Sequence, residues 1–224
     1  QRNLFATTWM CAGYAHETPN PGDVLPRTVA GVPILFTRTK SGEMRCFHNI
    51  CTHRGTVLVP REASGQQALR CRYHGWTFDL RDGELKAVIT DGPDSRMCGK
   101  AAVKTYPAEE RIGLIWVFMG DLEESKRYPI PPFPEYDDRK NWRPIYTDFT
   151  WEGSADRVVE NGIDIAHTSF VHPGFGYPDM ADKNHIASVE RTEISGVSHC
   201  VLYPPPLQGG FGLRKFLRKD KEPT

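Results

Sequence analysis

The sequence predicts a protein of the α+β class, in which an all-β domain is followed by a smaller region of helix and strand. Three observations support this. Up to about residue 120, short apolar segments of strand length alternate with turn signals. A charged and proline-rich stretch then interrupts the pattern over residues 121–140. Beyond it, residues 154 to about 170 have the flanking signals of a helix.

The first region is expected to be one all-β domain over residues 1–120. Gly and Pro number 20 and 18 in the chain, which favours short strands joined by turns. Asp82-Gly83 lies between two apolar stretches and predicts a hairpin. The segments expected to be strands are 32–37, 44–48, 68–71, 77–80 and 113–119.

A linker is predicted over residues 121–140, because the prolines of 129–134 exclude a helix interior or a central strand. A second domain is expected over 141–224. It would begin with a strand at 142–151 and continue with one helix from about 154 to 170. Ser154 is the predicted N-cap, and Asp156 in the first turn favours the helix dipole. Strand-like sequence returns after residue 187.

Composition excludes several classes of protein. The formal net charge is +0, which indicates neither nucleic acid nor an anionic membrane surface as a partner. The longest apolar run, residues 114–119, is too short to span a bilayer, and the first residues have no signal-peptide pattern. Four cysteines have no regular spacing, which favours buried free thiols in a reducing compartment, either the cytoplasm or an organelle stroma. They are Cys11, Cys46, Cys98 and Cys200.

Two short clusters carry the most specific signal. Cys51-Thr52-His53 and Cys71-Arg72-Tyr73-His74 are separated by seventeen residues. Two thiolates and two imidazoles in this order match the Rieske [2Fe–2S] pattern, in which neutral imidazoles raise the potential to about −150 mV or above. A structural zinc site also takes two Cys and two His. Zinc sites more often pair like ligands, whereas each cluster here is mixed and followed by glycine, so the sequence favours the Rieske interpretation.

A second candidate metal site lies on the predicted helix. Glu160, Asp164 and His167 would fall within about 60° of each other on one helix face, and His172 follows five residues after His167. A lone histidine is more simply interpreted as a core or surface residue. Two histidines with room for a carboxylate are instead two-thirds of the facial triad that holds non-haem Fe(II).

With both sites placed, the chain resembles the Rieske non-haem iron oxygenases, and within them the catalytic α subunits of the ring-hydroxylating and O-demethylating kind. The resemblance covers roughly residues 9–203. It rests on Cys51-Thr52-His53-Arg54-Gly55, Cys71-Arg72-Tyr73-His74-Gly75-Trp76 and Glu160-x3-Asp164-x2-His167-x4-His172.

The resemblance implies a Rieske domain followed by part of a helix-grip catalytic domain. Cys51 and Cys71 would hold one iron of the cluster, and His53 and His74 the other. The mononuclear Fe(II) would be bound by a further pair, His167 and His172.

The resemblance also assigns a role to Asp164. It would bridge a Rieske histidine of a neighbouring subunit and an iron-bound histidine. The alternative for Asp164 is a surface acid paired with Arg157, and Glu160 is expected to be a buried charge or a support for the ligands.

The resemblance further implies a terminal oxygenase component, which would hydroxylate, dihydroxylate or demethylate an apolar or aromatic substrate with O2. Its electrons would come from a flavin reductase, directly or through a ferredoxin. A homotrimer is the implied assembly.

The third iron ligand of the family is an Asp far downstream of the two histidines. Here the chain ends 52 residues after His172. The remaining candidates, Asp179, Asp182 and Asp220, have no convincing context, and the first two are expected to be surface turn residues. The simplest interpretation is an incomplete catalytic domain, and a splice near residues 204–212 is an alternative.

Two other classes of protein remain open. A Rieske ferredoxin-like electron carrier needs only residues up to about 120 and leaves His167 and His172 unexplained; an inactive oxygenase homologue is a related alternative. A zinc-stabilised interaction module would be colourless. Residues 174–177 are candidates for a pocket entrance. A basic tail is either a solvated face or a docking site for an acidic ferredoxin, and it comprises Arg214, Lys215, Arg218, Lys219 and Lys221.

Overall fold

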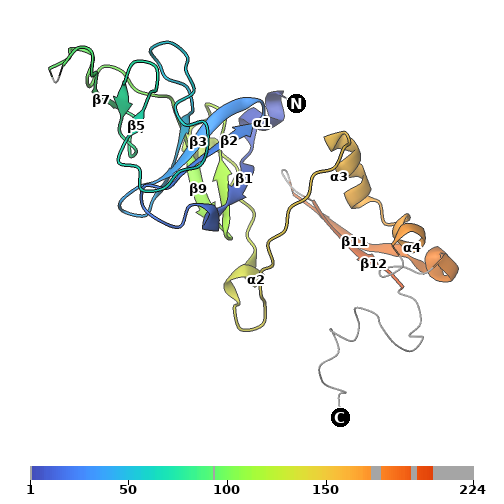
Figure 1. The fold of residues 1–224 in the computed structure, drawn as a ribbon. Coiled ribbons are helices and arrows are strands. Elements are labelled where there is room, and N and C mark those ends of the chain that lie inside the picture. Colours follow the sequence, from blue (N-terminus) through green and yellow to red (C-terminus); the bar gives the residue numbers. More distant parts are fainter. Residues whose placement is uncertain (1, 93, 173–177, 193–195, 204–224) are drawn as a thin grey trace. The chain divides into compact units, whose positions relative to one another are not determined.

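The computed structural model describes residues 2–92, 94–172, 178–192 and 196–203 (Figure 1). The chain divides into two compact units, Gln1–Ile145 and Tyr146–Thr224. Residues 174–177, 204–212 and the basic tail with Asp220 lie outside the described residues. No helix in the described ranges has the length and apolar character to cross a lipid bilayer.

The first unit is built from three antiparallel sheets and opens with a short helix, α1 (Arg2–Thr7). The largest sheet has the order β2-β3-β4-β8, and the second has the order β1-β10-β9. The strands of the first are Val24–Val29, Val32–Arg38, Met44–His48 and Thr105–Tyr106. Those of the second are Met10–Tyr14, Leu114–Val117 and Ala108–Arg111.

Strand β3 is the centre of this unit, because both of its faces are buried. Leu35 packs into one apolar cluster, and Ile34 and Phe36 pack into the other. Successive side chains of a strand point to opposite faces, so a strand between two cores must be apolar throughout. The expected strands at 32–37 and 44–48 are confirmed for this reason.

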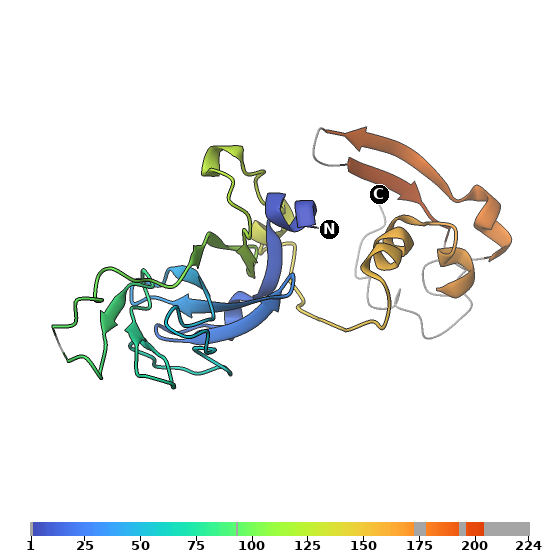
Figure 2. The same ribbon diagram turned by 90° about the horizontal axis from the view of Figure 1, so that it is seen from above.

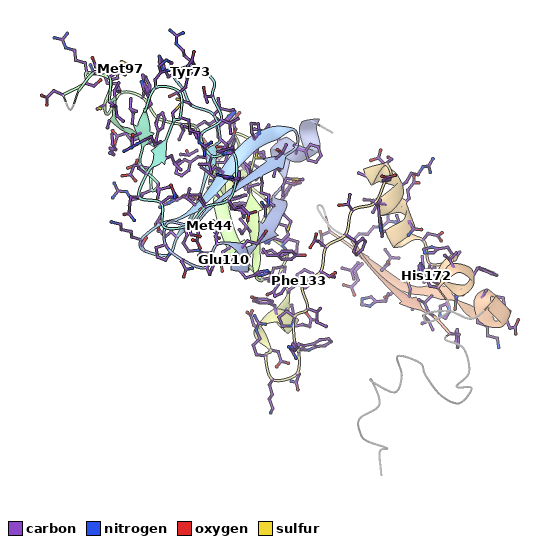
Figure 3. The ribbon with its side chains drawn as sticks, viewed as in Figure 1. Met44, Tyr73, Met97, Glu110, Phe133 and His172 are labelled. Carbon is purple, nitrogen blue, oxygen red and sulfur yellow. The ribbon has the colours of Figure 1, made fainter. Side chains whose placement is uncertain are left out.

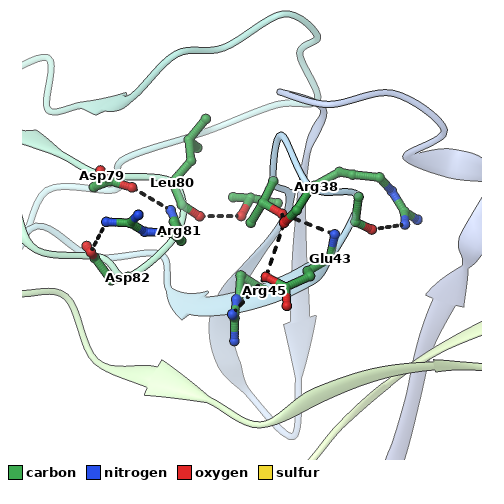
Figure 4. A network of polar contacts seen from close by, with 11 residues as sticks. Arg38, Glu43, Arg45, Asp79, Leu80, Arg81 and Asp82 are labelled. Atoms are coloured by element: carbon green, nitrogen blue, oxygen red, sulfur yellow. Dashed lines mark hydrogen bonds and ion pairs between the residues drawn. The ribbon is translucent and has the colours of Figure 1, made fainter.

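The third sheet, β5-β6-β7, lies at one end of the unit, with α1 towards the other (Figures 1 and 2). Its strands are Leu69–Arg70, Thr77–Phe78 and Leu85–Ala87. The predicted Asp82-Gly83 hairpin joins β6 to β7, and Gly83 has a φ of 74°. The Thr37 hydroxyl donates to the Leu80 carbonyl at 2.9 Å and ties this hairpin to β3 (Figure 4).

Residues 121–145 fall within the first unit. They contain a 3₁₀ turn, η2 (Glu124–Lys126), and a short helix, α2 (Pro134–Asp137), which begins at a proline as helix geometry allows. Ile130 is buried, and the Arg127 guanidinium lies 5.2 Å from the centre of the Phe118 ring. The proline-rich stretch is therefore packed against the β domain at these two positions.

The second unit contains α3 (Ala155–Ile163), α4 (Thr168–Val171), the 3₁₀ segment η3 (Pro178–Lys183) and an antiparallel hairpin. The hairpin strands, β11 (His185–Arg191) and β12 (Gly196–Val201), confirm the expectation of strand after residue 187. The strand expected at 142–151 is wrong. That segment pairs with no strand in the described part of the chain, and an extended segment without a partner gains no ladder of hydrogen bonds.

The single helix expected from 154 to 170 is also wrong, because α3 ends at Ile163. Asp164 has extended dihedral angles, φ −81° and ψ 113°, and its Oδ1 accepts the backbone N–H of Ala166 at 2.8 Å. Aspartate side chains compete for backbone donors in this way and so interrupt helices. Ser154 occupies the N-cap position but forms no side-chain cap hydrogen bond.

None of the six cysteines forms a disulfide, and Cys46 is buried as expected. The expectation of burial is wrong for Cys11 and Cys200, which are exposed, and Cys98 is half-buried. Cys11 alternates along β1 with two residues that pack against the core, so it faces the other side of the strand. Cys200 lies on β12, whose residues are exposed almost throughout.

Candidate functional site

The two Cys/His clusters lie on loops with the same backbone hydrogen bonds. In each loop the cysteine N–H donates to the carbonyl five residues later, Thr56 or Trp76, at 2.8 Å. The glycine four residues after the cysteine, Gly55 or Gly75, donates back to the cysteine carbonyl at 3.0 Å. Both glycines have positive φ, 71° and 70°, which only glycine adopts without strain. The sequence thus builds one type of loop twice.

The thiols and the imidazoles of these loops differ in burial. Cys51 and Cys71 are 1% and 3% exposed and belong to the apolar cluster under the small sheet. His53 and His74 are half-buried, and their ring centres are 4.8 Å apart. The structure therefore brings the predicted cluster residues together as two pairs, with the two thiols buried and the two imidazoles nearer the surface.

This arrangement fits a two-iron cluster better than a single zinc ion. A Rieske cluster takes its cysteines on one iron and its histidines on the other, so the protein ligands form two separate pairs. A tetrahedral zinc site instead requires its ligands to converge on one point.

The electrostatics of the site oppose ionisation of the thiols and favour the neutral form of the imidazoles. Burial raises the pKa of the Cys51 thiol, although the backbone N–H of His53 lowers it, and the neighbouring Cys71 thiol raises it further. Metal binding must therefore displace thiol protons. Desolvation, together with the charges of His74 and Arg54, lowers the pKa of His53. The neutral imidazole, which is the form that binds metals, is favoured there.

Aromatic side chains surround the two imidazoles. The Trp76 ring lies parallel to that of His53, with an interplanar angle of 5°, and the Tyr73 ring centre is 3.9 Å from that of His74. Tyr73 is exposed and lies with Met97 at the same end of the unit (Figure 3). Sequence reasoning assigned no role to Trp76 or Tyr73, although both lie close to a predicted ligand in the motif.

The second candidate site lies around α4. His167 and His172 stand at its two ends, with ring centres 5.3 Å apart. His167 Nδ1 lies 3.4 Å from Asp164 Oδ2, but it is buried and has no hydrogen-bond partner among the described residues. A buried nitrogen without a hydrogen bond is costly, so this atom requires a partner that completes the site.

The carboxylates expected near this site behave differently from one another. Asp164 lies beside His167, although the break after α3 and not a shared helix face brings them together. Glu160 is exposed and forms an ion pair with Arg157, with Oε2 2.5 Å from Nη1, so the expectation of a buried charge is wrong. Arg157, the alternative partner suggested for Asp164, is therefore paired with Glu160 instead. Asp179 and Asp182 are exposed on η3.

Comparison with known proteins places this geometry in a family. The family model of the Rieske [2Fe-2S] domain matches residues 8–107. The carnitine monooxygenase oxygenase subunit of Acinetobacter pittii is 28% identical over 190 residues, which is 80% of this chain and 50% of that protein. The terminal oxygenase component of carbazole 1,9a-dioxygenase from Sphingomonas sp is 34% identical over 165 residues, 73% of this chain and 42% of that protein.

Among solved structures, a reduced complex of oxygenase and ferredoxin in carbazole 1,9a-dioxygenase aligns with a TM-score of 0.46 and 30% identity, covering 53% of this chain and 30% of that one. The chain spans about half or less of the length of the curated relatives named above.

Residues 8–107 are therefore a Rieske [2Fe–2S] domain, and a [2Fe–2S] cluster is its cofactor. Over 73–80% of its length the chain is similar to oxygenase components of the Rieske non-haem iron oxygenases, a family whose members also carry a mononuclear iron in the catalytic domain.

Proposed function

We propose that this chain is part of a terminal oxygenase component that uses O2 and externally supplied electrons to hydroxylate, dihydroxylate or demethylate an apolar or aromatic substrate. The observation that carries the proposal is the pair of matched loops, which presents two buried thiols and two outer imidazoles within a Rieske domain. The relatives named above, a monooxygenase and a dioxygenase, support an oxygenase of this kind.

The proposed cluster ligands are Cys51 and Cys71 on one iron and His53 and His74 on the other. The buried thiols would hold the inner iron, and the half-buried imidazoles would bring the outer iron close to the surface. When bound, such a cluster accepts and passes on single electrons. His74, beside the exposed Tyr73, is the proposed exit for the electron.

The proposed mononuclear iron ligands are His167 and His172, completed by a carboxylate that the described residues do not supply. Asp164 is the proposed bridge. Its Oδ1 is held by the Ala166 N–H, which leaves Oδ2 directed at the His167 ring. The Asp164 carboxylate can therefore orient the His167 imidazole and hold its proton. The same carboxylate would also contact a Rieske histidine of a second subunit. This bridge implies a homotrimer or another closed ring of subunits.

A flavin reductase, directly or through a ferredoxin, is the proposed electron donor.

The test is to purify the full chain anaerobically and to measure its visible spectrum, its electron paramagnetic resonance (EPR) spectrum after reduction, and its iron content. Cys51→Ala should abolish the cluster signals. Cys98→Ala is the matched control, because Cys98 packs against the same apolar cluster without a predicted ligand role, and it should keep them. A colourless protein that contains zinc would contradict the proposal.

An electron carrier is the second candidate function, because the matched Rieske domain at residues 8–107 suffices for electron transfer. Iron counting separates the two candidates. An oxygenase component should bind three irons per chain when its catalytic domain is whole, whereas a carrier binds only the two of the cluster.

A further inference from the structure

We propose that Trp76 is a positioning residue for His53, which holds the plane of this imidazole and shields its half of the cluster from water. The inference deepens the proposed function and rests on it in one respect, since His53 must be an iron ligand.

The two cluster loops differ at the position that follows the glycine. Their backbones have the same hydrogen bonds, yet this position is Thr56 in the first loop and Trp76 in the second. Trp76 is buried and belongs to the apolar cluster that includes Phe78. The core of the domain therefore anchors a large ring at the edge of the metal site on one side only.

The anchored ring lies on the histidine of the opposite loop. The ring centres of Trp76 and His53 are 4.6 Å apart, and their planes differ by 5°. A rotation of the His53 ring out of this plane would bring its edge into the indole, so the stack restrains the imidazole before any metal is bound. The T-shaped contact with His74, at 64° between planes, borders the same ring.

His74 has no comparable support from the core among the described ring contacts. Its aromatic neighbour is Tyr73, whose ring is tilted by 36° and whose side chain is 60% exposed. One imidazole is thus backed by a buried indole and the other by an exposed phenol. The two histidines should differ in solvation and in freedom of orientation, although both belong to the same proposed iron.

This asymmetry affects the energy of reduction. A cluster of two ferric ions, two sulfides, two thiolates and two neutral imidazoles is neutral, and it gains one negative charge when it takes up an electron. Water near the cluster would stabilise that charge, and the indole excludes water from His53. The face of an aromatic ring is also electron-rich, which disfavours additional negative charge beside it. Both effects of Trp76 lower the reduction potential.

The test uses the full chain with its cluster, reduced by dithionite and reoxidised by ferricyanide in a potentiometric titration. Trp76→Leu should raise the midpoint potential and change the nitrogen hyperfine coupling of one histidine ligand in pulsed EPR. Trp76→Phe, which keeps an aromatic face, should restore both towards the wild-type values. Phe78→Leu is the matched control, because Phe78 is buried in the same cluster and its ring centre lies 6.3 Å from that of Trp76.

Phe78→Leu should lower the stability of the domain and leave both the midpoint potential and the nitrogen hyperfine coupling unchanged. If Trp76→Leu keeps a loaded cluster whose potential and couplings are those of the wild type, or if Phe78→Leu shifts them equally, the proposal is overturned. If the Trp76→Leu protein does not accumulate in a folded form, Trp76→Phe and Trp76→Met are compared instead. The potential and the hyperfine coupling should then shift in Trp76→Met and not in Trp76→Phe, and any other result overturns the proposal. A wild-type chain without a cluster would instead contradict the proposed function itself.

Discussion

Cys51 and Cys71 are almost fully enclosed by the core, whereas His53 and His74 remain half-buried. At the scale of single residues, this division separates the part of the site that must be stable from the part that must exchange electrons. Thiols in an apolar setting are costly to ionise, and metal binding compensates for this cost. The imidazoles need no such compensation, because they bind as neutral groups.

Asp164 provides the sharpest prediction at this scale. Asp164→Asn should keep the hydrogen bond to the Ala166 N–H, and with it the end of α3, while it removes the charge beside His167. We expect the iron content to be unchanged and turnover to fall by about 10–100-fold or more, as for other groups that orient metal ligands. Single-turnover reoxidation of the reduced cluster, with iron analysis, measures both quantities.

Asp164→Ala removes the local hydrogen bond as well, and it should lose turnover without losing the cluster. Arg157→Ala is a suitable control, because Arg157 pairs with Glu160 on the exposed face of α3. Full activity of Asp164→Asn would exclude the proposed bridge.

At the scale of the elements, two glycine turns can be compared: Gly83 between β6 and β7, and Gly31 between β2 and β3. Gly83 and Gly31 both have positive φ, 74° and 78°. A Cβ at Gly83 would lie 2.8 Å from Val103 Cγ2 and 2.9 Å from Phe47 Cδ1, whereas at Gly31 it would meet nothing within 4 Å. The two positions therefore have the same backbone strain and different crowding.

Gly31→Ala should cost about 1–2 kcal/mol of stability through the backbone alone. Gly83→Ala should cost about 1–3 kcal/mol more, because the added methyl group overpacks the core. Urea unfolding of both variants measures the difference. Equal losses would show that the Gly83 turn relaxes without cost.

Strands β4 and β8 carry a pair of residues whose ionisation opposes folding. Cys46 lies opposite Tyr106 in the sheet register. Burial strongly raises the pKa of the Cys46 thiol above its ordinary value of 9.0, and burial followed by the charge of Cys46 raises the pKa of Tyr106 above 10.0. Above about pH 9, the folded chain therefore keeps protons on these two groups that the unfolded chain releases.

The stability contributed by these groups is complete below about pH 9 and is lost as the pH rises further, with a limiting slope of about 1.4 kcal/mol per pH unit for the buried thiol. Urea unfolding between pH 8 and about 10.5 measures this loss. Cys46→Val should make the slope shallower. An unchanged slope in this variant would mean that other groups are responsible.

At the scale of the whole chain, the two units differ in how much core they contain. Both apolar clusters draw their members from residues 10–119, and Ile130 adds a buried contact from the proline-rich stretch. The described residues of the second unit contribute no member to either cluster. The Rieske domain therefore has apolar clusters of its own.

A chain that ends at Ile145 should accordingly fold and keep the cluster spectrum of the full chain, while it loses the iron that we propose His167 and His172 bind. EPR and iron analysis of the two chains measure this. A truncated chain that cannot hold the cluster would show that the first unit needs the second.

Features that depend on neighbouring residues could be predicted from the amino-acid sequence. Strands 32–37 and 44–48, the Asp82-Gly83 hairpin and the strands after residue 187 follow from apolar patterning and turn residues, which act over a few positions. The spacing of the Cys and His residues likewise predicted the Rieske domain that the family model matches.

The arrangement of distant or competing groups could not be predicted in this way and depends on the tertiary structure. The helix α3 ends at Asp164, where a side chain competes with the helix for a backbone donor, and residues 142–151 have no strand partner in the described part of the chain. Trp76 lies on the histidine of the other loop. Such contacts depend on the packing of the whole domain, since residues far apart in sequence meet only when the core between them is complete.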